Sequence, residues 1–174
     1  MRLRRVGGAG DGGVDLVGQW YLDADPPSPD EQPAVALLRT LRSNAAAPPS
    51  PHTDSAPAPV SVLVQCKAEQ SAVGPGAVRD LLGTLASQYD SAATLGILVS
   101  LNGFTRQAIA TAEGTATDSS VRGGAVCLAT VTAAGTCTTF WVAPAASRLL
   151  GGHLRAVSAA GGRVRMSWRG TPLR

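Results

Sequence analysis

Residues 60–67 read Val-Ser-Val-Leu-Val-Gln-Cys-Lys, and this stretch decides how the chain folds. Its β-branched residues and its period of two predict a strand. The alternation places Gln65 and Lys67 on one face and leaves Cys66 with the valines on the other. We therefore expect a polar pair that points outward while the apolar face of the strand is buried.

Lys67 is the only lysine among the 15 basic residues of the chain, and all the others are arginines. An ammonium group is a compact, titratable point charge, whereas a guanidinium is planar and always charged. A chain this biased toward arginine keeps a lysine mainly where that difference matters. Lys67 is therefore a candidate functional residue.

A glycine-rich segment lies upstream, where residues 7–18 read Gly-Gly-Ala-Gly-Asp-Gly-Gly-Val-Asp-Leu-Val-Gly and lead into an extended stretch through Leu22. Glycine permits positive φ and close backbone approach, so a sharp turn can present Asp15 at the start of a strand. The segment also satisfies the dinucleotide pattern GxGxxG. That pattern needs a helix after it, and the residues that follow favour a strand, which argues against a dinucleotide site.

These two segments, in this order, resemble the restriction-endonuclease-like fold in its Mrr-like branch, whose signature is an Asp followed by (Glu/Gln)-x-Lys. Three segments are similar to the fungal mitochondrial family named required for respiratory growth protein 7. They read Gly-Gly-Val-Asp-Leu-Val-Gly-Gln-Trp, Val-Gln-Cys-Lys-Ala-Glu and Gly-Pro-Gly-Ala-Val-Arg-Asp-Leu. The resemblance covers most of the chain outside residues 23–59. It implies an α/β fold, a restriction-endonuclease-like mixed β-sheet flanked by helices, and a mitochondrial location.

The resemblance also implies a nuclease site that uses a divalent metal, with magnesium as the expected ion. Magnesium prefers oxygen ligands and activates water for attack on phosphate. The expected ligands are the Asp15 carboxylate, the Gln65 side-chain carbonyl and the Cys66 backbone carbonyl, while Lys67 orients the water or stabilises charge on the phosphate. Gln65 replaces the more usual glutamate, so metal binding should be weaker.

Each of these residues also has a simpler explanation. Asp15 could cap the turn, and Gln65 and Lys67 could be ordinary residues of a half-exposed strand. Nucleases of this type usually carry a further acidic residue on a helix before the glycine turn, and Met1 stands too close for that helix. Either the gene model is truncated or that acid is not used. Asp11 and Glu69 are the residues that could compensate.

Two classes of function therefore remain open. One is a metal-dependent nuclease of mitochondrial nucleic acid. The other is a catalytically inactive nuclease-fold protein that binds nucleic acid or protein in mitochondrial genome maintenance or expression.

The length of 174 residues, 44% of them hydrophobic, predicts a single domain with one modest core. Residues 1–22 hold the glycine-rich turn and the first core strand, and residues 60–174 form the remainder of the domain. Between them, residues 23–59 contain nine of the 12 prolines and are predicted to be a disordered insertion. Residues 34–41 could form about two helical turns or only a transient helix.

Beyond residue 67 the pattern alternates as an α/β chain should. We expect helices and strands in turn, with helices at 76–89, 104–112 and 145–157 and strands at 96–101, 125–132, 138–142 and 163–168.

The charge distribution indicates a partner. The net charge is only +3, yet no acidic residue follows Asp118. This arrangement fits a surface for a phosphate backbone, with DNA favoured over RNA, although an ordinary soluble face or a coding bias toward arginine would also produce it. Aromatic residues make up only 4%, which disfavours a base-stacking platform. The arginines after Asp118 are Arg122, Arg148, Arg155, Arg163, Arg165, Arg169 and Arg174.

The remaining candidates are weaker. The three widely spaced cysteines, Cys66, Cys127 and Cys137, predict buried thiols in a reducing compartment rather than disulfides or a zinc site. His52 and His153 have no partner at ligand spacing.

Targeting and membrane signals are few. No apolar stretch is long enough to span a bilayer. Arg2, Arg4 and Arg5 resemble the start of a mitochondrial presequence, but the mitochondrial prediction depends chiefly on the family resemblance. The sequence does not indicate an oligomeric state.

Overall fold

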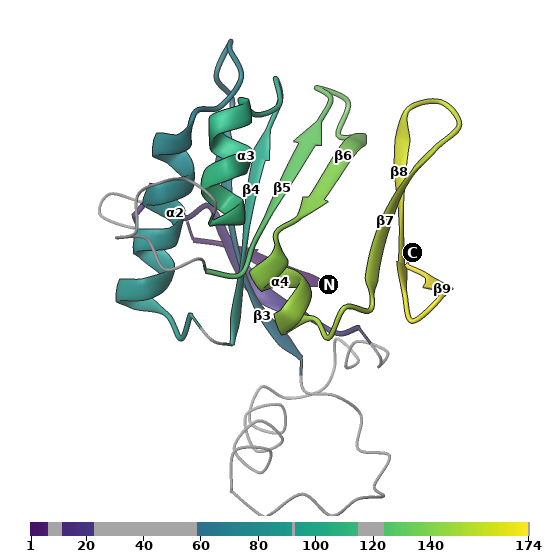
Figure 1. Ribbon diagram of the computed structural model, residues 1–174, viewed down its shortest axis with the longest axis horizontal. Helices are drawn as coiled ribbons and strands as arrows, with labels where there is room; N and C mark the ends of the chain where they lie inside the picture. Colours follow the sequence, from purple (N-terminus) through teal and green to yellow (C-terminus); the bar gives the residue numbers. More distant parts are fainter. Residues whose placement is uncertain (7–11, 23–58, 92, 115–123, 174) are drawn as a thin grey trace, which may run out of the picture.

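The computed structural model describes residues 1–6, 12–22, 59–91, 93–114 and 124–173, and Figure 1 shows its arrangement. Strands and helices alternate through the middle of the chain. The elements are β1 (Arg2–Arg5), β2 (Leu16–Trp20), β3 (Val60–Lys67), α2 (Pro75–Gln88), β4 (Thr94–Ser100), α3 (Arg106–Glu113), β5 (Val126–Val131), β6 (Cys137–Val142), α4 (Pro144–Leu149), β7 (Leu154–Ala159), β8 (Arg163–Trp168) and β9 (Thr171–Pro172).

The main sheet is mixed, with six strands in the order β1-β2-β3-β4-β5-β6. Strands β3, β4 and β5 are parallel to one another, and the strands outside them pair antiparallel. Parallel neighbours need crossover connections, and α2 and α3 provide them. The two helices lie side by side in Figure 1. This is the mixed α/β architecture that the sequence predicted.

Helix α2 packs closely on the sheet at Gly96. A Cβ at this position would lie 2.8 Å from Leu85 Cδ1 and 3.3 Å from Leu81 Cδ2, so a larger residue would require the leucine side chains of the helix to shift. Gly96 therefore marks the face of the sheet that α2 covers. Its partner Leu63 lies on the same face because paired residues of neighbouring strands point the same way. By alternation, Gln65 and Lys67 also belong to the α2 face.

The prediction for residues 60–67 was right about the strand and wrong about its burial. Gln65, expected to point outward, is only 4% exposed. Strand β3 lies inside the sheet between β2 and β4, and α2 covers the face of Gln65, so both faces of its central residues are buried. Cys66, expected on the buried face, is exposed because it lies near the carboxyl end of the strand.

Most of the predicted elements after residue 67 are present, but the helix predicted over residues 145–157 is wrong beyond Leu149. Gly151 and Gly152 adopt φ values of +59° and +70°, which end the helix. The residues from Leu154 onward instead form β7, which pairs antiparallel with β8. The helix considered for residues 34–41 and the insertion predicted over residues 23–59 fall almost wholly outside the described residues.

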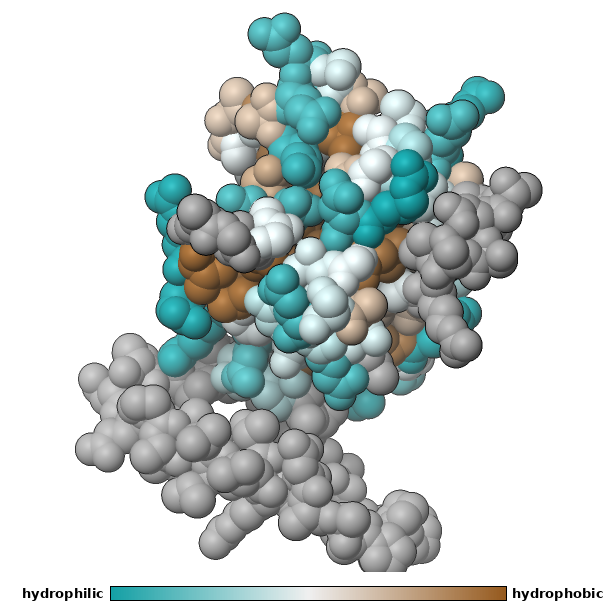
Figure 2. All heavy atoms as spheres, turned by 90° about the vertical axis from the view of Figure 1, so that its left-hand side faces the viewer, coloured by the Kyte–Doolittle hydropathy of each residue, from teal (hydrophilic) through white to brown (hydrophobic). Residues whose placement is uncertain are grey.

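A small second sheet, β7-β8-β9, contacts β6. It joins the core through Leu154 and Trp168, which are 8% and 7% exposed. Figure 2 views the molecule from the side of α2, where hydrophilic and neutral side chains cover most of the described surface and apolar areas are small. Within the described residues, no helix is both long enough and apolar enough to traverse a bilayer.

Candidate functional site

Asp15 is fixed at the entrance to β2 by backbone and side-chain hydrogen bonds. Its backbone N–H donates to the Val64 carbonyl at 3.0 Å, and its own carbonyl accepts from the Val6 N–H at 2.9 Å. Its carboxylate oxygen Oδ2 accepts from the backbone N–H of Cys66 at 2.7 Å. Because that bond joins residues 51 positions apart, Asp15 holds β2 against the end of β3 and does not merely cap its own turn.

Gln65 is a buried polar side chain whose carbonyl oxygen has no partner. Its Oε1 atom is buried and makes no hydrogen bond with any described residue. A buried amide oxygen without a partner is unfavourable, so its persistence requires a reason. Oxygen of this kind is also a ligand that hard divalent cations prefer.

The glycine-rich turn closes over Gln65. Gly13 has a φ of +79°, and a Cβ there would collide with Gln65 Nε2, so glycine is required for both its backbone conformation and its lack of a side chain. Thr84 on α2 donates from Oγ1 to the Gly12 carbonyl at 3.3 Å. The turn is thus held between β3 and α2. Asp11, one of the residues considered as a compensating acid, lies outside the described residues.

Lys67 is half-buried and pairs in register with Ser100 at the carboxyl end of β4. It makes no side-chain hydrogen bond or ion pair with a described residue. Because Gln65 and Lys67 are two residues apart on one strand, their Cα atoms are about 6.6 Å apart and share the α2 face. Asp15 reaches the same strand end through its side chain, because its Oδ2 accepts from the N–H of Cys66, which lies between Gln65 and Lys67. All three predicted residues therefore lie at or against the carboxyl end of β3.

Two polar residues that sequence reasoning missed support this edge. Ser100 is 1% exposed, and its Oγ accepts from the Asn102 N–H at 3.1 Å. Asn102 Nδ2 in turn donates to the Glu69 carbonyl at 2.6 Å, which ties the loop after β3 to the loop after β4. Glu69 itself is exposed and uses only its backbone here. Their roles depend on the register between β3 and β4, which the pattern of residues along the sequence does not reveal.

The pKa values of all three cysteine thiols are raised. Partial burial, and then the Asp15 carboxylate, raise the pKa of the Cys66 thiol, although the residue as a whole is exposed. Burial raises the pKa of Cys127 to about 12. Burial also raises the pKa of Cys137, while a hydrogen bond to the Thr139 carbonyl opposes that change. At neutral pH these thiols stay protonated, and a protonated thiol is a poor ligand and nucleophile.

Oxygen ligands fit the arrangement better. The Asp15 carboxylate, the Gln65 carbonyl, which has no described partner, and the backbone carbonyl of Cys66 are oxygen donors of the kind that magnesium prefers. Asp15 supplies the only negative charge among these three donors. No cluster of three or more His, Cys, Asp or Glu residues in the described part of the chain could hold a metal ion. His153 instead contacts the ring of Trp168 edge-on at 5.5 Å, and His52 lies outside the described residues.

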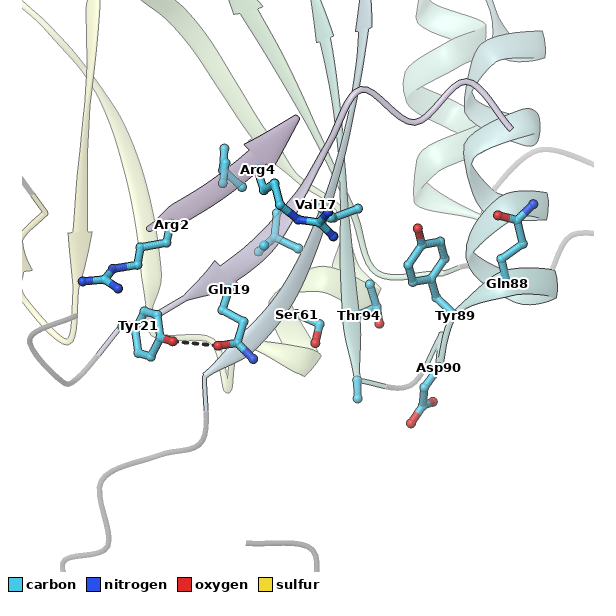
Figure 3. Close-up of a pocket in the computed structure, with 14 residues that line it drawn as sticks. Arg2, Arg4, Val17, Gln19, Tyr21, Ser61, Gln88, Tyr89, Asp90 and Thr94 are labelled. Atoms are coloured by element: carbon cyan, nitrogen blue, oxygen red, sulfur yellow. Dashed lines mark hydrogen bonds between the residues drawn. The ribbon is translucent and has the colours of Figure 1, made fainter. Parts of the chain in front are cut away.

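A separate groove of about 980 Å³ runs along β1 and β2 (Figure 3). Arg2 and Arg4, which resemble the start of a presequence, lie in β1, which pairs with β2, and both line this groove. Tyr21 donates a hydrogen bond to Gln19 Oε1 at 2.6 Å beside them. Ser61 belongs to the amino end of β3, about 20 Å from the carboxyl end, so the groove is not the Asp15–Gln65–Lys67 site.

Comparison with known proteins identifies relatives of this chain. The family model described as "Required for respiratory growth protein 7" matches residues 1–118. A mitochondrial protein of Schizosaccharomyces pombe is 34% identical over 111 residues, which cover 64% of this chain and 32% of that protein. The protein named required for respiratory growth protein 7, mitochondrial, of Eremothecium gossypii is 38% identical over 120 residues, which cover 63% of this chain and 49% of that protein.

The protein of the same name in Saccharomyces cerevisiae is 37% identical over 95 residues, which cover 49% of this chain and 39% of that protein. The chain thus spans between about a third and a half of the length of these relatives. No solved structure matches it. The family match ends at residue 118, so all elements from β5 onward lie outside it.

Proposed function

Because the chain belongs to the required for respiratory growth protein 7 family, we propose that it is a metal-dependent nuclease that hydrolyses phosphodiester bonds in mitochondrial nucleic acid. The protein is mitochondrial, as its relatives are named, and its family is one required for respiratory growth. The observation that carries the proposal is the buried Gln65 carbonyl, which has no hydrogen-bond partner among the described residues, while the next residue, Cys66, donates its N–H to the Asp15 carboxylate.

A restriction-endonuclease-like fold of the Mrr-like branch is part of this proposal. Two features of the architecture support it. Asp15 stands at the start of β2, and Gln65 and Lys67 close β3, which is the inner strand that pairs with β2. The mixed sheet with α2 and α3 as crossover helices supplies the flanking layer.

In this proposal three residues supply metal ligands, and Lys67 supplies a positive charge for the phosphate. Asp15 Oδ1 and Oδ2, Gln65 Oε1 and the carbonyl of Cys66 would hold magnesium. When bound, that ion polarises a phosphoryl oxygen and lowers the pKa of an attacking water. Asp15 already gives one carboxylate oxygen to the Cys66 N–H, which orients its carboxylate toward the end of β3.

Lys67 acts on the substrate rather than on the metal. Its ammonium carries three donors on a flexible stem and has no described partner that would hold it elsewhere. In hydrolysis, water oxygen bonds to phosphorus and gives up a proton to solvent, the bond from phosphorus to the leaving oxygen breaks, and that oxygen takes up a proton from solvent. Negative charge grows on the phosphoryl oxygens. An ammonium beside these oxygens stabilises that charge more in the transition state than in the ground state.

A second function is supported by one observation. Asp15 provides the only carboxylate among the proposed ligands, and a lone carboxylate binds magnesium weakly. A nuclease-fold protein that has lost catalysis and binds nucleic acid or protein would retain the same fold. The two functions differ in whether the purified chain cleaves.

The test is cleavage of supercoiled plasmid DNA by the full chain in magnesium and in EDTA. We expect cleavage in magnesium alone, and a loss of about 100-fold or more in Lys67→Arg and Asp15→Asn, as for removal of one transition-state donor. Arg79→Lys is the matched control, because it exchanges the same two cations at an exposed position on α2. Lys67→Arg cleavage equal to that of the parent would overturn the assigned role. A parent that binds but never cleaves would establish the inactive alternative.

A further inference from the structure

The β7–β8 hairpin has two chemically different faces. Its register pairs Val157 with Arg165 and Ala159 with Arg163. Directly paired residues of antiparallel strands share a face, and so do residues two apart on one strand. Arg155, Arg163 and Arg165 consequently lie on one face. The other face carries Leu154 and Trp168, which are buried in the core.

The arginine face points to solvent. Arg155, Arg163 and Arg165 are all exposed, and Val157 between them is 62% exposed. None of the three arginines forms an ion pair with a described residue. No acidic residue follows Asp118 in the sequence, so the hairpin contains no charge that could neutralise them. The three residues therefore present three positive charges on one surface, and no described residue neutralises them through an ion pair.

The spacing of these charges suits a linear array of phosphates. Arg163 and Arg165 are two residues apart, and Arg155 lies across from Ser167, two residues farther along β8. The set extends over about 13 Å along the strands and about 5 Å across them. Duplex DNA rises about 3.4 Å per nucleotide of each strand, so this length faces roughly four phosphates. Guanidinium groups bind phosphate oxygens in a bidentate manner, which a point charge does not.

We propose that the face made by Arg155, Arg163 and Arg165 binds the phosphate backbone of duplex DNA. The choice of DNA rests on the proposed nuclease function, but the surface itself is independent of the Asp15–Gln65–Lys67 site. The face contains no aromatic side chain, so it lacks the stacking platform that single strands require. It also lies outside the family match, which ends at residue 118.

The test measures duplex binding without cleavage. A fluorescein-labelled DNA duplex is titrated with the full chain in EDTA at several salt concentrations, and binding is followed by anisotropy. The variant Arg155→Gln/Arg163→Gln/Arg165→Gln should reduce the log–log salt slope by about 2.7, or 0.9 for each lost contact. A fourfold rise in salt would then weaken the parent about 40-fold more than the variant.

A control variant, Arg5→Gln/Arg79→Gln/Arg106→Gln, removes the same charge at exposed positions elsewhere and should retain the parent's salt slope. The urea midpoints of both variants establish that they fold. An equal reduction of the salt slope in both variants would show that only net charge matters and would overturn the proposal. So would a parent whose binding ignores salt, or an arginine face that binds vesicles of anionic phospholipid but not the duplex.

The two proposals fail separately. If the parent never cleaves DNA but its binding depends on the three arginines, the nuclease function falls and the arginine face stands. If the parent cleaves DNA and the triple variant binds the duplex with an unchanged salt slope, the arginine face falls and the nuclease function stands.

Discussion

Replacement of Gln65 by methionine should make the metal-free protein more stable. Gln65 is 4% exposed, and its carbonyl oxygen has no described hydrogen-bond partner. If this oxygen binds a cation, it lowers the stability of the metal-free protein, in which it has no ligand to contact. Methionine is also unbranched, and its flexible side chain fills the same space without a polar atom.

The magnitude follows from the unpaired oxygen. A buried polar atom that loses its hydrogen bonds to water and gains none costs about 1–3 kcal/mol. Methionine removes this cost. Imperfect packing of the new side chain offsets part of the gain, because even volume-conserving core exchanges cost up to about 1.5 kcal/mol. We therefore expect Gln65→Met to raise the free energy of unfolding in EDTA by about 1–2 kcal/mol. For a chain of this size, that corresponds to a rise in Tm of roughly 2–8 °C.

The assay is urea unfolding of parent and variant in EDTA and in magnesium. Magnesium at 100 times its Kd should stabilise the parent by about 2.7 kcal/mol and leave Gln65→Met nearly unchanged. Thr84→Val is the control, because Thr84 is a buried polar residue that does have a partner, the Gly12 carbonyl. This variant should have a free energy of unfolding about 1 kcal/mol below that of the parent. A Gln65→Met protein less stable than the parent in EDTA would refute the reasoning.

Two further predictions concern the surroundings of the site. Because the Asp15 carboxylate helps to raise the pKa of Cys66, Asp15→Asn should lower that pKa and increase the thiolate fraction at pH 8. Iodoacetamide should then label Cys66 faster, as followed by peptide mass spectrometry. An unchanged labelling rate would contradict this prediction. Thr105 is the N-cap of α3 and accepts a hydrogen bond from the Ala108 N–H at 3.1 Å. Thr105→Ala should therefore lower the free energy of unfolding, measured in urea, by about 1 kcal/mol, and Thr105→Ser should largely restore it.

The elements that the sequence predicted well are those with local signals. The helical spacing of residues 76–89 corresponds to α2, and the alternation of residues 60–67 corresponds to β3. The hairpin β7–β8 was missed in part because a short apolar spacing after α4 imitates a helix. Its true state depends on pairing with β8 and on Gly151, which ends the helix with a positive φ.

Burial was harder to predict than secondary structure because it depends on distant neighbours. Nothing within residues 60–67 indicates that β2, β4 and α2 enclose Gln65, or that the strand end leaves Cys66 exposed. The candidate site residues were predicted because their types and order match a known signature. Ser100 and Asn102 were not, since their roles appear only when β4 is placed beside β3.

The most direct test of the central claim is whether Asp15 and Gln65 bind one divalent cation. Manganese, which prefers the same oxygen ligands as magnesium, can be titrated into the full chain while the signal of the free ion is followed by electron paramagnetic resonance. We predict one bound ion for the parent, weaker or absent binding for Asp15→Asn, and tighter binding for Gln65→Glu, which adds a negative charge. A parent that binds no manganese, or an Asp15→Asn variant that binds it as the parent does, would contradict the account.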